Sequence, residues 1–198
     1  TLILLLATPL FSQVSTQPEQ PFKLANYSSG GGERVGLVFG ELLIDLRQAN
    51  DYVEEHAGLN ELRMPRDMLR LIERQGELKP RLFQIANYIG NQLDELSFAY
   101  NLNEVTLHAP IKYPYNLLAA GQNYRAHAAE MGGDDTIDPD EDDPFFFAKS
   151  PRSTIIDPNE PFIMQPHHRT IDWEGEFSIV IGSETRYVSL ETAMDHVF

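Results

Sequence analysis

The sequence contains no cysteine and is poor in basic residues. The missing cysteines exclude disulfide bonds, thiolate metal sites and a cysteine nucleophile, although they say little about the compartment. Fifteen lysines and arginines stand against thirty acidic residues, which gives a formal net charge of −15. This charge disfavours nucleic acid and anionic membranes as partners, because both would repel the protein.

Long hydrophobic runs are also lacking. The almost unbroken apolar run from Leu2 to Phe11 is too short to span a bilayer as a helix, but it has the length of the apolar region of a secretory signal. We therefore expect residues 1–20 to be a signal peptide and spacer, and the protein to be secreted or periplasmic. If the run is instead a buried element of the fold, a cytoplasmic location is expected. The chain starts at Thr1, so we expect residues to be missing before it.

The remaining composition is that of a globular protein. Hydrophobic residues make up 42% of the chain, and 198 residues suffice for one ordinary domain or two small ones. β-Branched and aromatic runs predict three early strands, at 22–27, 34–39 and 42–46, the last two of which form a hairpin. Apolar residues at helical spacing then predict two packing helices, at 64–75 and 82–96. The pattern changes near residue 104, so we expect a small N-terminal α/β domain over residues 21–104.

A short helix is predicted in the next segment, after a strand near residues 117–120. Gly132 is a typical C-terminal signal for this helix. His127 and Glu130 are three residues apart and so lie on one helix face. A carboxylate there can orient an imidazole and raise its basicity, as a water-activating pair requires. The alternative is an ordinary surface pair.

Two further features precede the C-terminal part. Residues 134–143 hold seven acids in ten positions but lack the glycine and glutamate of an EF-hand loop, so a solvated loop is expected. Lys149 ends the apolar run that starts at Phe145. Its ammonium group is either an ordinary surface charge or a cation beside an anionic site.

Alternating acids then run into an apolar stretch at 172–182. On a strand, Asp172, Glu174 and Glu176 would point to one side, and Trp173 and Phe177 would point to the other, toward a core. Three neighbouring carboxylates need water or a cation to relieve their repulsion, and oxygen ligands suit Mg²⁺, Mn²⁺ or Ca²⁺. The sequence therefore leaves two interpretations, a metal site and a solvated edge strand.

Taken in order, three motifs resemble the fumarylacetoacetate hydrolase family. They are Gly-Gln-Asn-Tyr-Arg-x-His-x-x-Glu at 121–130, Pro-Phe-Phe-Phe-Ala-Lys at 144–149, and Asp-x-Glu-x-Glu at 172–176. The likeness covers roughly residues 22–198 and includes the small N-terminal domain of bacterial members. It implies an α+β chain in which residues 105–198 form the first part of a mainly-β, sandwich-like roll.

The resemblance also implies site residues. Glu174 and Glu176 correspond to the two family glutamates that hold Mg²⁺, or Mn²⁺ or Ca²⁺. The third ligand of the family, an aspartate, belongs to a motif beyond residue 198, so we expect this chain to be truncated before the end of the catalytic domain. His127 and Glu130 correspond to the water-activating pair on a lid, and Lys149 to a lysine that contacts substrate.

The implied activity is metal-dependent hydrolysis of a C–C bond in a β-diketo or 2-oxo acid, by a protein that is a homodimer when complete. The alternative within the family is an isomerase or decarboxylase of a 2-oxo or 2-hydroxydienoic acid in aromatic catabolism. A rival from another class is a non-catalytic secreted binding protein that keeps the fold. The joint presence of the acid–base pair and the two glutamates argues against that rival.

Overall fold

The computed structural model describes residues 14–121, 123–130, 132 and 143–198. The chain divides into two compact units, one of residues 1–110 with 157–198 and one of residues 111–156. The acidic stretch 134–143, apart from Asp143, and the apolar run of the expected signal peptide lie outside the described residues. No helix of the described part is long and apolar enough to cross a membrane.

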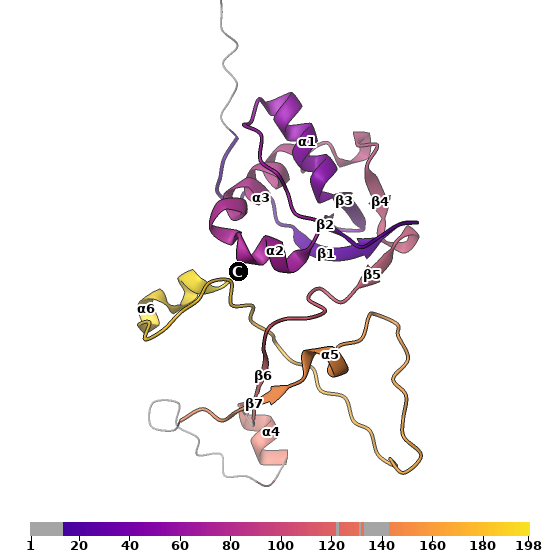
Figure 1. Ribbon diagram of the computed structural model, residues 1–198, viewed down its shortest axis with the longest axis vertical. Helices are drawn as coiled ribbons and strands as arrows, with labels where there is room; N and C mark the ends of the chain where they lie inside the picture. The colour runs from indigo at the N-terminus through magenta and orange to yellow at the C-terminus, as the bar shows by residue number, and fades with distance from the viewer. Residues whose placement is uncertain (1–13, 122, 131, 133–142) are drawn as a thin grey trace, which may run out of the picture. The chain divides into compact units, whose positions relative to one another are not determined.

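A five-stranded antiparallel sheet organises the N-terminal part of the first unit (Figure 1). The strand order is β4-β3-β2-β1-β5, and all four pairings are antiparallel. Gly40, at a φ of 57°, makes the tight turn between β2 and β3, a backbone conformation that glycine adopts without strain. The strands are β1 (Lys23–Ser28), β2 (Arg34–Phe39), β3 (Leu42–Asp45), β4 (Ala99–Asn101) and β5 (Thr106–His108).

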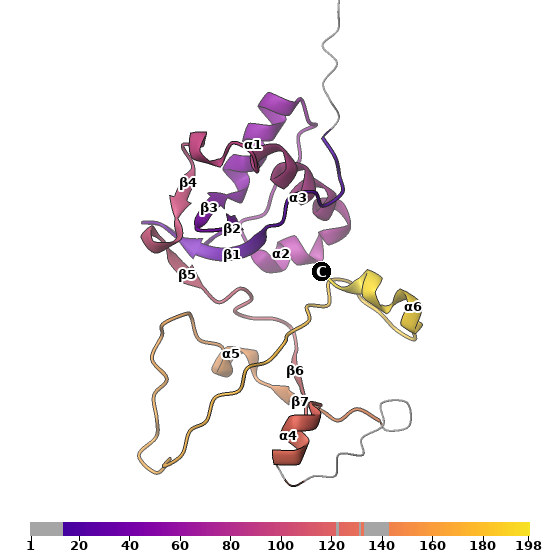
Figure 2. The ribbon, with the colours of Figure 1, turned by 180° about the vertical axis from the view of Figure 1, so that it is seen from behind.

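Three helices pack together beside this sheet: α1 (Leu46–Ala57), α2 (Met68–Glu73) and α3 (Gln75–Ile89) (Figure 2). Helix α1 contacts β2 and β3, and α3 contacts α1. Leucine, isoleucine and valine side chains from the sheet and the helices are fully buried between them, among them Leu37, Leu43, Ile44, Leu46, Val53, Leu71, Leu78, Ile85 and Ile89. This core contributes most of the hydrophobic stabilisation in the part of the chain that the structure describes.

Helix α1 was not anticipated from the sequence, although its signals are present. The Asp45 side chain caps it by accepting hydrogen bonds from the backbone N–H groups of Arg47 and Gln48, at 3.1 and 3.0 Å. Gly58 ends it in the left-handed conformation. The helix predicted over 82–96 was wrong in its bounds, because α3 spans Gln75–Ile89 and has Pro80 inside it. Buried Leu78 and the Arg74–Glu77 ion pair support its first turn.

The second unit contains a two-stranded antiparallel sheet and two short helices. Strand β6 (Leu117–Ala120) pairs with β7 (Phe146–Lys149), and α4 (Arg125–Glu130) and α5 (Pro151–Thr154) accompany them. The short elements outside this unit are three 3₁₀ helices and one α-helix: η1 (Leu93–Glu95), η2 (Leu102–Glu104), α6 (Leu190–Ala193) and η3 (Met194–His196). The chain is thus of mixed α+β class, as predicted. The domain boundaries drawn from the sequence stay a prediction.

The strand predicted over residues 172–182 is not formed. Residues 161–180 have no regular secondary structure, and only Ile181 makes an isolated bridge, with Val197. Trp173 and Phe177, predicted to face a core, are 88% and 83% exposed. A strand requires a continuous row of hydrogen bonds to a partner. Apart from the bond between the N–H of Phe198 and the carbonyl of Val180, the described residues form no strand pairing with 161–180, and Trp173 and Phe177 lie open to solvent.

Candidate active site

Helix α4 carries the predicted acid–base pair. It is a short helix anchored by Ala128, which is buried and whose backbone N–H donates to the carbonyl of Tyr124 at 3.0 Å. Gly132, at a φ of 75°, follows the helix in the conformation expected of a C-terminal signal. The predicted helix and its end are therefore present.

His127 and Glu130 point to the same side of α4, with 3.9 Å between the imidazole Nδ1 and a carboxylate oxygen of Glu130. This distance is too long for a hydrogen bond but short enough for an ion pair when the imidazole is protonated. The two side chains are 38% and 80% exposed, so water reaches both. Catalytic contacts are often this loose before substrate binds.

Lys149 occupies the last position of β7, opposite Leu117 of β6. Its ammonium nitrogen lies 5.7 Å from the centre of the Phe147 ring, within the range of a cation–π contact. The pairing of β6 with β7 continues to Gly121, whose N–H donates to the carbonyl of Phe145 at 2.9 Å. A Cβ at Gly121 would come within 2.6 Å of the Phe145 ring, which is 69% exposed, so a larger residue here would have to displace that ring.

Glu174 and Glu176 lie in the segment that precedes Ile181, and both are exposed. Their shared face was predicted for a strand, and no strand forms over these residues. Their oxygens suit Mg²⁺, Mn²⁺ or Ca²⁺. Among the described residues, however, no group of three histidine, aspartate or glutamate side chains is placed to hold a metal ion.

The predicted site residues are thus divided between the two units. The structure brings His127 and Glu130 together on α4, in the unit of residues 111–156 that also holds Lys149. Glu174 and Glu176 belong to the unit that contains residues 157–198. The roles of all five residues stay a prediction.

One polar cluster was missed by the sequence reasoning. Ser28 Oγ lies 2.9 Å from His108 Nε2, and His108 Nδ1 lies 3.1 Å from a carboxylate oxygen of Asp157. The other Asp157 oxygen accepts the backbone N–H of Ala109 at 2.9 Å. These hydrogen bonds connect Asp157, at the start of the 157–198 segment, to His108 of β5, and His108 to Ser28 of β1. The three residues are too far apart in the sequence for any local pattern to reveal them.

Comparison with known proteins identifies the family. Residues 116–198 match the family described as "Fumarylacetoacetate (FAA) hydrolase C-terminal". The chain belongs to the fumarylacetoacetate hydrolase family. It is 35% identical over 175 residues to the oxaloacetate tautomerase YisK of Bacillus subtilis, covering 84% of this chain and 56% of that protein. It is 31% identical over 134 residues to the mitochondrial oxaloacetate tautomerase FAHD2A of Bos taurus, covering 68% and 38%.

A solved structure supports the family fold. The maleylpyruvate hydrolase of Sphingobium sp. SYK-6, crystallised with manganese(II) and pyruvate, superposes with a TM-score of 0.53 at 24% identity. The match covers 88% of this chain and 55% of that chain. The present chain therefore spans about half the length of the Bacillus tautomerase and of the maleylpyruvate hydrolase.

Proposed function

We propose that the protein is a divalent-metal-dependent enzyme that interconverts the keto and enol forms of a small 2-oxo dicarboxylic acid such as oxaloacetate. The observation that carries this proposal is the 35% identity to the Bacillus tautomerase over 84% of the chain. The second relative, from cattle, has the same named activity. Tautomerisation belongs to the isomerase alternative drawn from the sequence, and it replaces C–C bond hydrolysis as the preferred reaction.

Glu174 and Glu176 would contribute two carboxylates to the metal, which we propose to be Mg²⁺ or Mn²⁺, with Ca²⁺ as a further candidate. The chemistry of these donors fits a hard divalent cation, although the described residues alone do not complete the ligand set. When bound, such a cation polarises a carbonyl and stabilises the negative charge of an enolate.

The chain's own residues account for the movement of protons. In ketone-to-enol conversion, His127 accepts the proton from the carbon next to the carbonyl, and the imidazolium then gives that proton to the enolate oxygen. Glu130 stabilises the resulting imidazolium, for which the 3.9 Å separation already suffices as an ion pair. The ammonium group of Lys149 would bind a substrate carboxylate. The exposure of His127 allows direct contact with a small acid.

Hydrolysis of an acylpyruvate-type C–C bond is the second candidate. The specific observation in its favour is that both members of the His127–Glu130 pair are open to water. Water held by the imidazole could attack a carbonyl of the substrate. A tautomerase must prevent this attack. The two reactions therefore differ in whether bound substrate excludes water from α4.

The test uses full-length protein and freshly dissolved enol-oxaloacetate, whose ultraviolet absorbance falls as the ketone forms. We expect Mg²⁺ or Mn²⁺ to accelerate this decay, and EDTA to return it to the buffer rate. An acylpyruvate is the matched substrate, and its cleavage is followed by release of the carboxylic acid. Cleavage of the acylpyruvate without acceleration of ketonisation would overturn the tautomerase assignment in favour of hydrolysis. Inactivity on both substrates would favour the binding-protein alternative.

The assembly and the compartment are further proposals. We propose that residues 105–198 contribute the first part of a β-roll, that the complete protein is a homodimer, and that residues 1–20 direct its export. Sedimentation velocity tests the dimer. Intact residues 2–11 in protein recovered from outside the cytoplasm would contradict a cleaved signal.

A further inference from the structure

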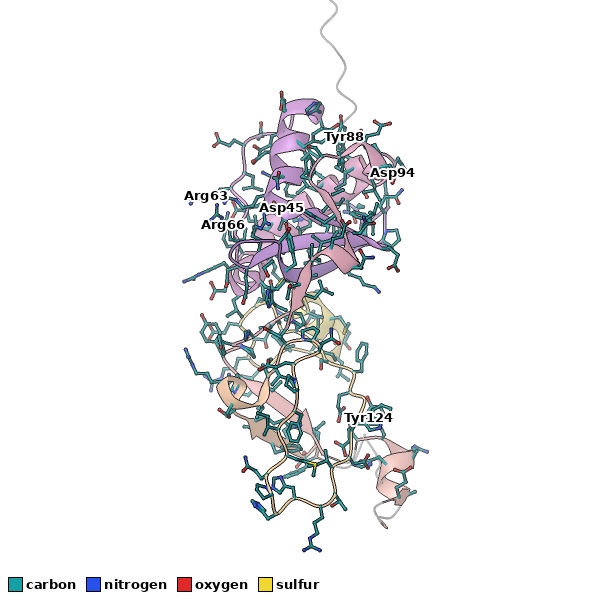
Figure 3. The ribbon with its side chains drawn as sticks, turned by 90° about the vertical axis from the view of Figure 1, so that its right-hand side faces the viewer. Asp45, Arg63, Arg66, Tyr88, Asp94 and Tyr124 are labelled. Carbon is teal, nitrogen blue, oxygen red and sulfur yellow. The ribbon has the colours of Figure 1, made fainter. Side chains whose placement is uncertain are left out.

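A cationic hollow lies in the N-terminal part of the first unit, where the start of α1 meets the segment that leads into α2. It has a volume of about 550 Å³. Four of its lining residues are arginines, Arg47, Arg63, Arg66 and Arg70, and Asp67 is the one acid among the described residues that line it. Its formal charge is therefore +3 in a chain whose total is −15. Figure 3 shows Arg63 and Arg66 projecting from the same side of this unit.

The acidic groups nearby leave most of this charge uncompensated. Asp67 Oδ1 accepts the backbone N–H of Arg70 at 3.0 Å and caps α2. Arg70 is paired with Glu73 at 2.7 Å. Arg47, Arg63 and Arg66 make no ion pair with any described carboxylate. Like charges gathered in this way repel one another, and an anion would relieve that repulsion.

The segment that carries Arg63 and Arg66 is held in place from behind. Leu62 is fixed at both backbone groups, because its carbonyl accepts from Asn50 Nδ2 at 2.9 Å and its N–H donates to Glu54 at 2.7 Å. Arg81, which is buried, donates to the carbonyl of Asn60 and forms an ion pair with Glu54 at 3.1 Å.

Further contacts complete this support. The carbonyl of Arg63 accepts from Arg74 Nη1 at 3.1 Å. Met64 and Met68, on either side of the arginine at position 66, are buried. Four side chains thus bond the backbone of residues 60–63, so the backbone that leads into the hollow is held in place without a ligand. A site ordered in advance loses less conformational entropy when it binds.

We propose that this hollow binds a small metabolite that carries a diphosphate group. Guanidinium groups are planar and weakly hydrated, and they match phosphate oxygens in pairs. Arg47, Arg63 and Arg66 offer three guanidinium groups that have no carboxylate partner among the described residues, whereas Arg70 is already paired with Glu73. The two phosphates of a diphosphate have more oxygens to pair with these three groups than a single phosphate has. The open volume leaves room for an organic group beside the phosphates. None of the five proposed site residues lines the hollow, so this ligand is not the 2-oxo acid substrate.

Calorimetric titration of the full-length protein with inorganic pyrophosphate, at constant ionic strength, tests the proposal. We expect saturable binding with one site per chain. The double variant Arg63→Gln/Arg66→Gln should weaken it by about tenfold or more, because two charge-assisted pairs are lost. The matched control is Arg169→Gln/Arg186→Gln, which removes the same charge at exposed arginines outside the hollow. This control should change the affinity by less than about twofold, a weak long-range effect at physiological ionic strength.

Three outcomes would overturn the proposal. The first is the absence of saturable heat with pyrophosphate. The second is an equal loss of affinity in the control variant, which would assign binding to net charge and not to the hollow. The third is equal affinity for citrate, which would show selection for any polyanion. Backbone amide resonances near Arg47 and Arg70 should shift when pyrophosphate is added. In the absence of pyrophosphate, the Arg63→Gln/Arg66→Gln variant should keep the wild-type tautomerase rate.

Discussion

Substitution of Asp45, the one carboxylate in the strands of the five-stranded sheet, should destabilise the N-terminal part of the protein. Asp45 is 3% exposed and serves two sets of partners. One oxygen caps α1 through two backbone N–H groups. The other accepts the hydroxyl of buried Tyr27 at 2.7 Å and the guanidinium of Arg34 at 3.2 Å.

The expected loss for Asp45→Ala follows from these contacts. A lost N-cap costs about 0.5–2 kcal/mol. A buried tyrosine hydroxyl without an acceptor costs about 1–3 kcal/mol. The Arg34 pair adds less than about 1 kcal/mol, because the arginine is partly exposed and screened. We therefore expect the free energy of unfolding to fall by about 2–5 kcal/mol.

Urea denaturation followed by circular dichroism measures this loss, and two further variants separate its parts. Asp45→Ser keeps an oxygen that can cap α1, but this oxygen cannot also accept the Tyr27 hydroxyl. The variant should therefore recover only the part of the free energy of unfolding that comes from the N-cap. In a double-mutant cycle, Asp45→Ala and Tyr27→Phe should couple by about 1 kcal/mol or more, since they share one hydrogen bond. An Asp45→Ala variant within about 0.5 kcal/mol of wild type would refute this account of the sheet–helix junction.

Three further predictions concern single side chains. Burial, followed by the hydrogen bond to Asp45, raises the pKa of Tyr27 well above its ordinary value of 10.0. Because the folded state holds the proton more tightly, stability is unaffected below pH 10 and falls above it by about 1.4 kcal/mol per pH unit. Denaturation of Tyr27→Phe across this range should show a shallower loss, and equal slopes would contradict the linkage. His127→Ala should lower kcat for ketonisation by about 10²-fold or more while metal affinity stays unchanged, and a wild-type rate would remove His127 from the mechanism. Gly121→Ala should destabilise the β6–β7 pair by about 0.5–1.5 kcal/mol in thermal unfolding, because its methyl group would force the exposed Phe145 ring away from its rotamer, and an unchanged melting temperature would contradict that contact.

Local patterns predicted much of this fold. Strands β1, β2 and β3 follow from alternation and from the glycine turn at position 40, and α4 follows from its C-terminal glycine. The N-terminal signal of α1 is equally local: Asp45 caps it, and Leu46, Ala49, Val53 and Ala57 are buried at helical spacing. That helix was predictable and was overlooked.

Non-local features could not be predicted in the same way. The alternation at 172–177 predicted a strand that is not formed. Strand formation depends on a partner that a local pattern does not specify. The bonds among Ser28, His108 and Asp157 join distant parts of the chain. The arginine hollow likewise joins Arg47 of α1 to residues 63–70, at the start of α2, which are distant in the sequence. The candidate site residues came from three motifs that follow one another in the order typical of the family. This order identifies the family, but it does not give the distances between the site residues.

The central claim is that Glu174 and Glu176 hold a divalent metal that drives enolisation. The most direct measurement is calorimetric titration of full-length Glu174→Gln with Mg²⁺ or Mn²⁺, beside the matched control Glu184→Gln at an exposed position. The account predicts that Glu174→Gln loses metal affinity by about tenfold or more and loses ketonisation activity with it, since a charged oxygen ligand is replaced by a neutral amide. The control should bind metal as wild type does. Wild-type metal affinity in Glu174→Gln would contradict the claim.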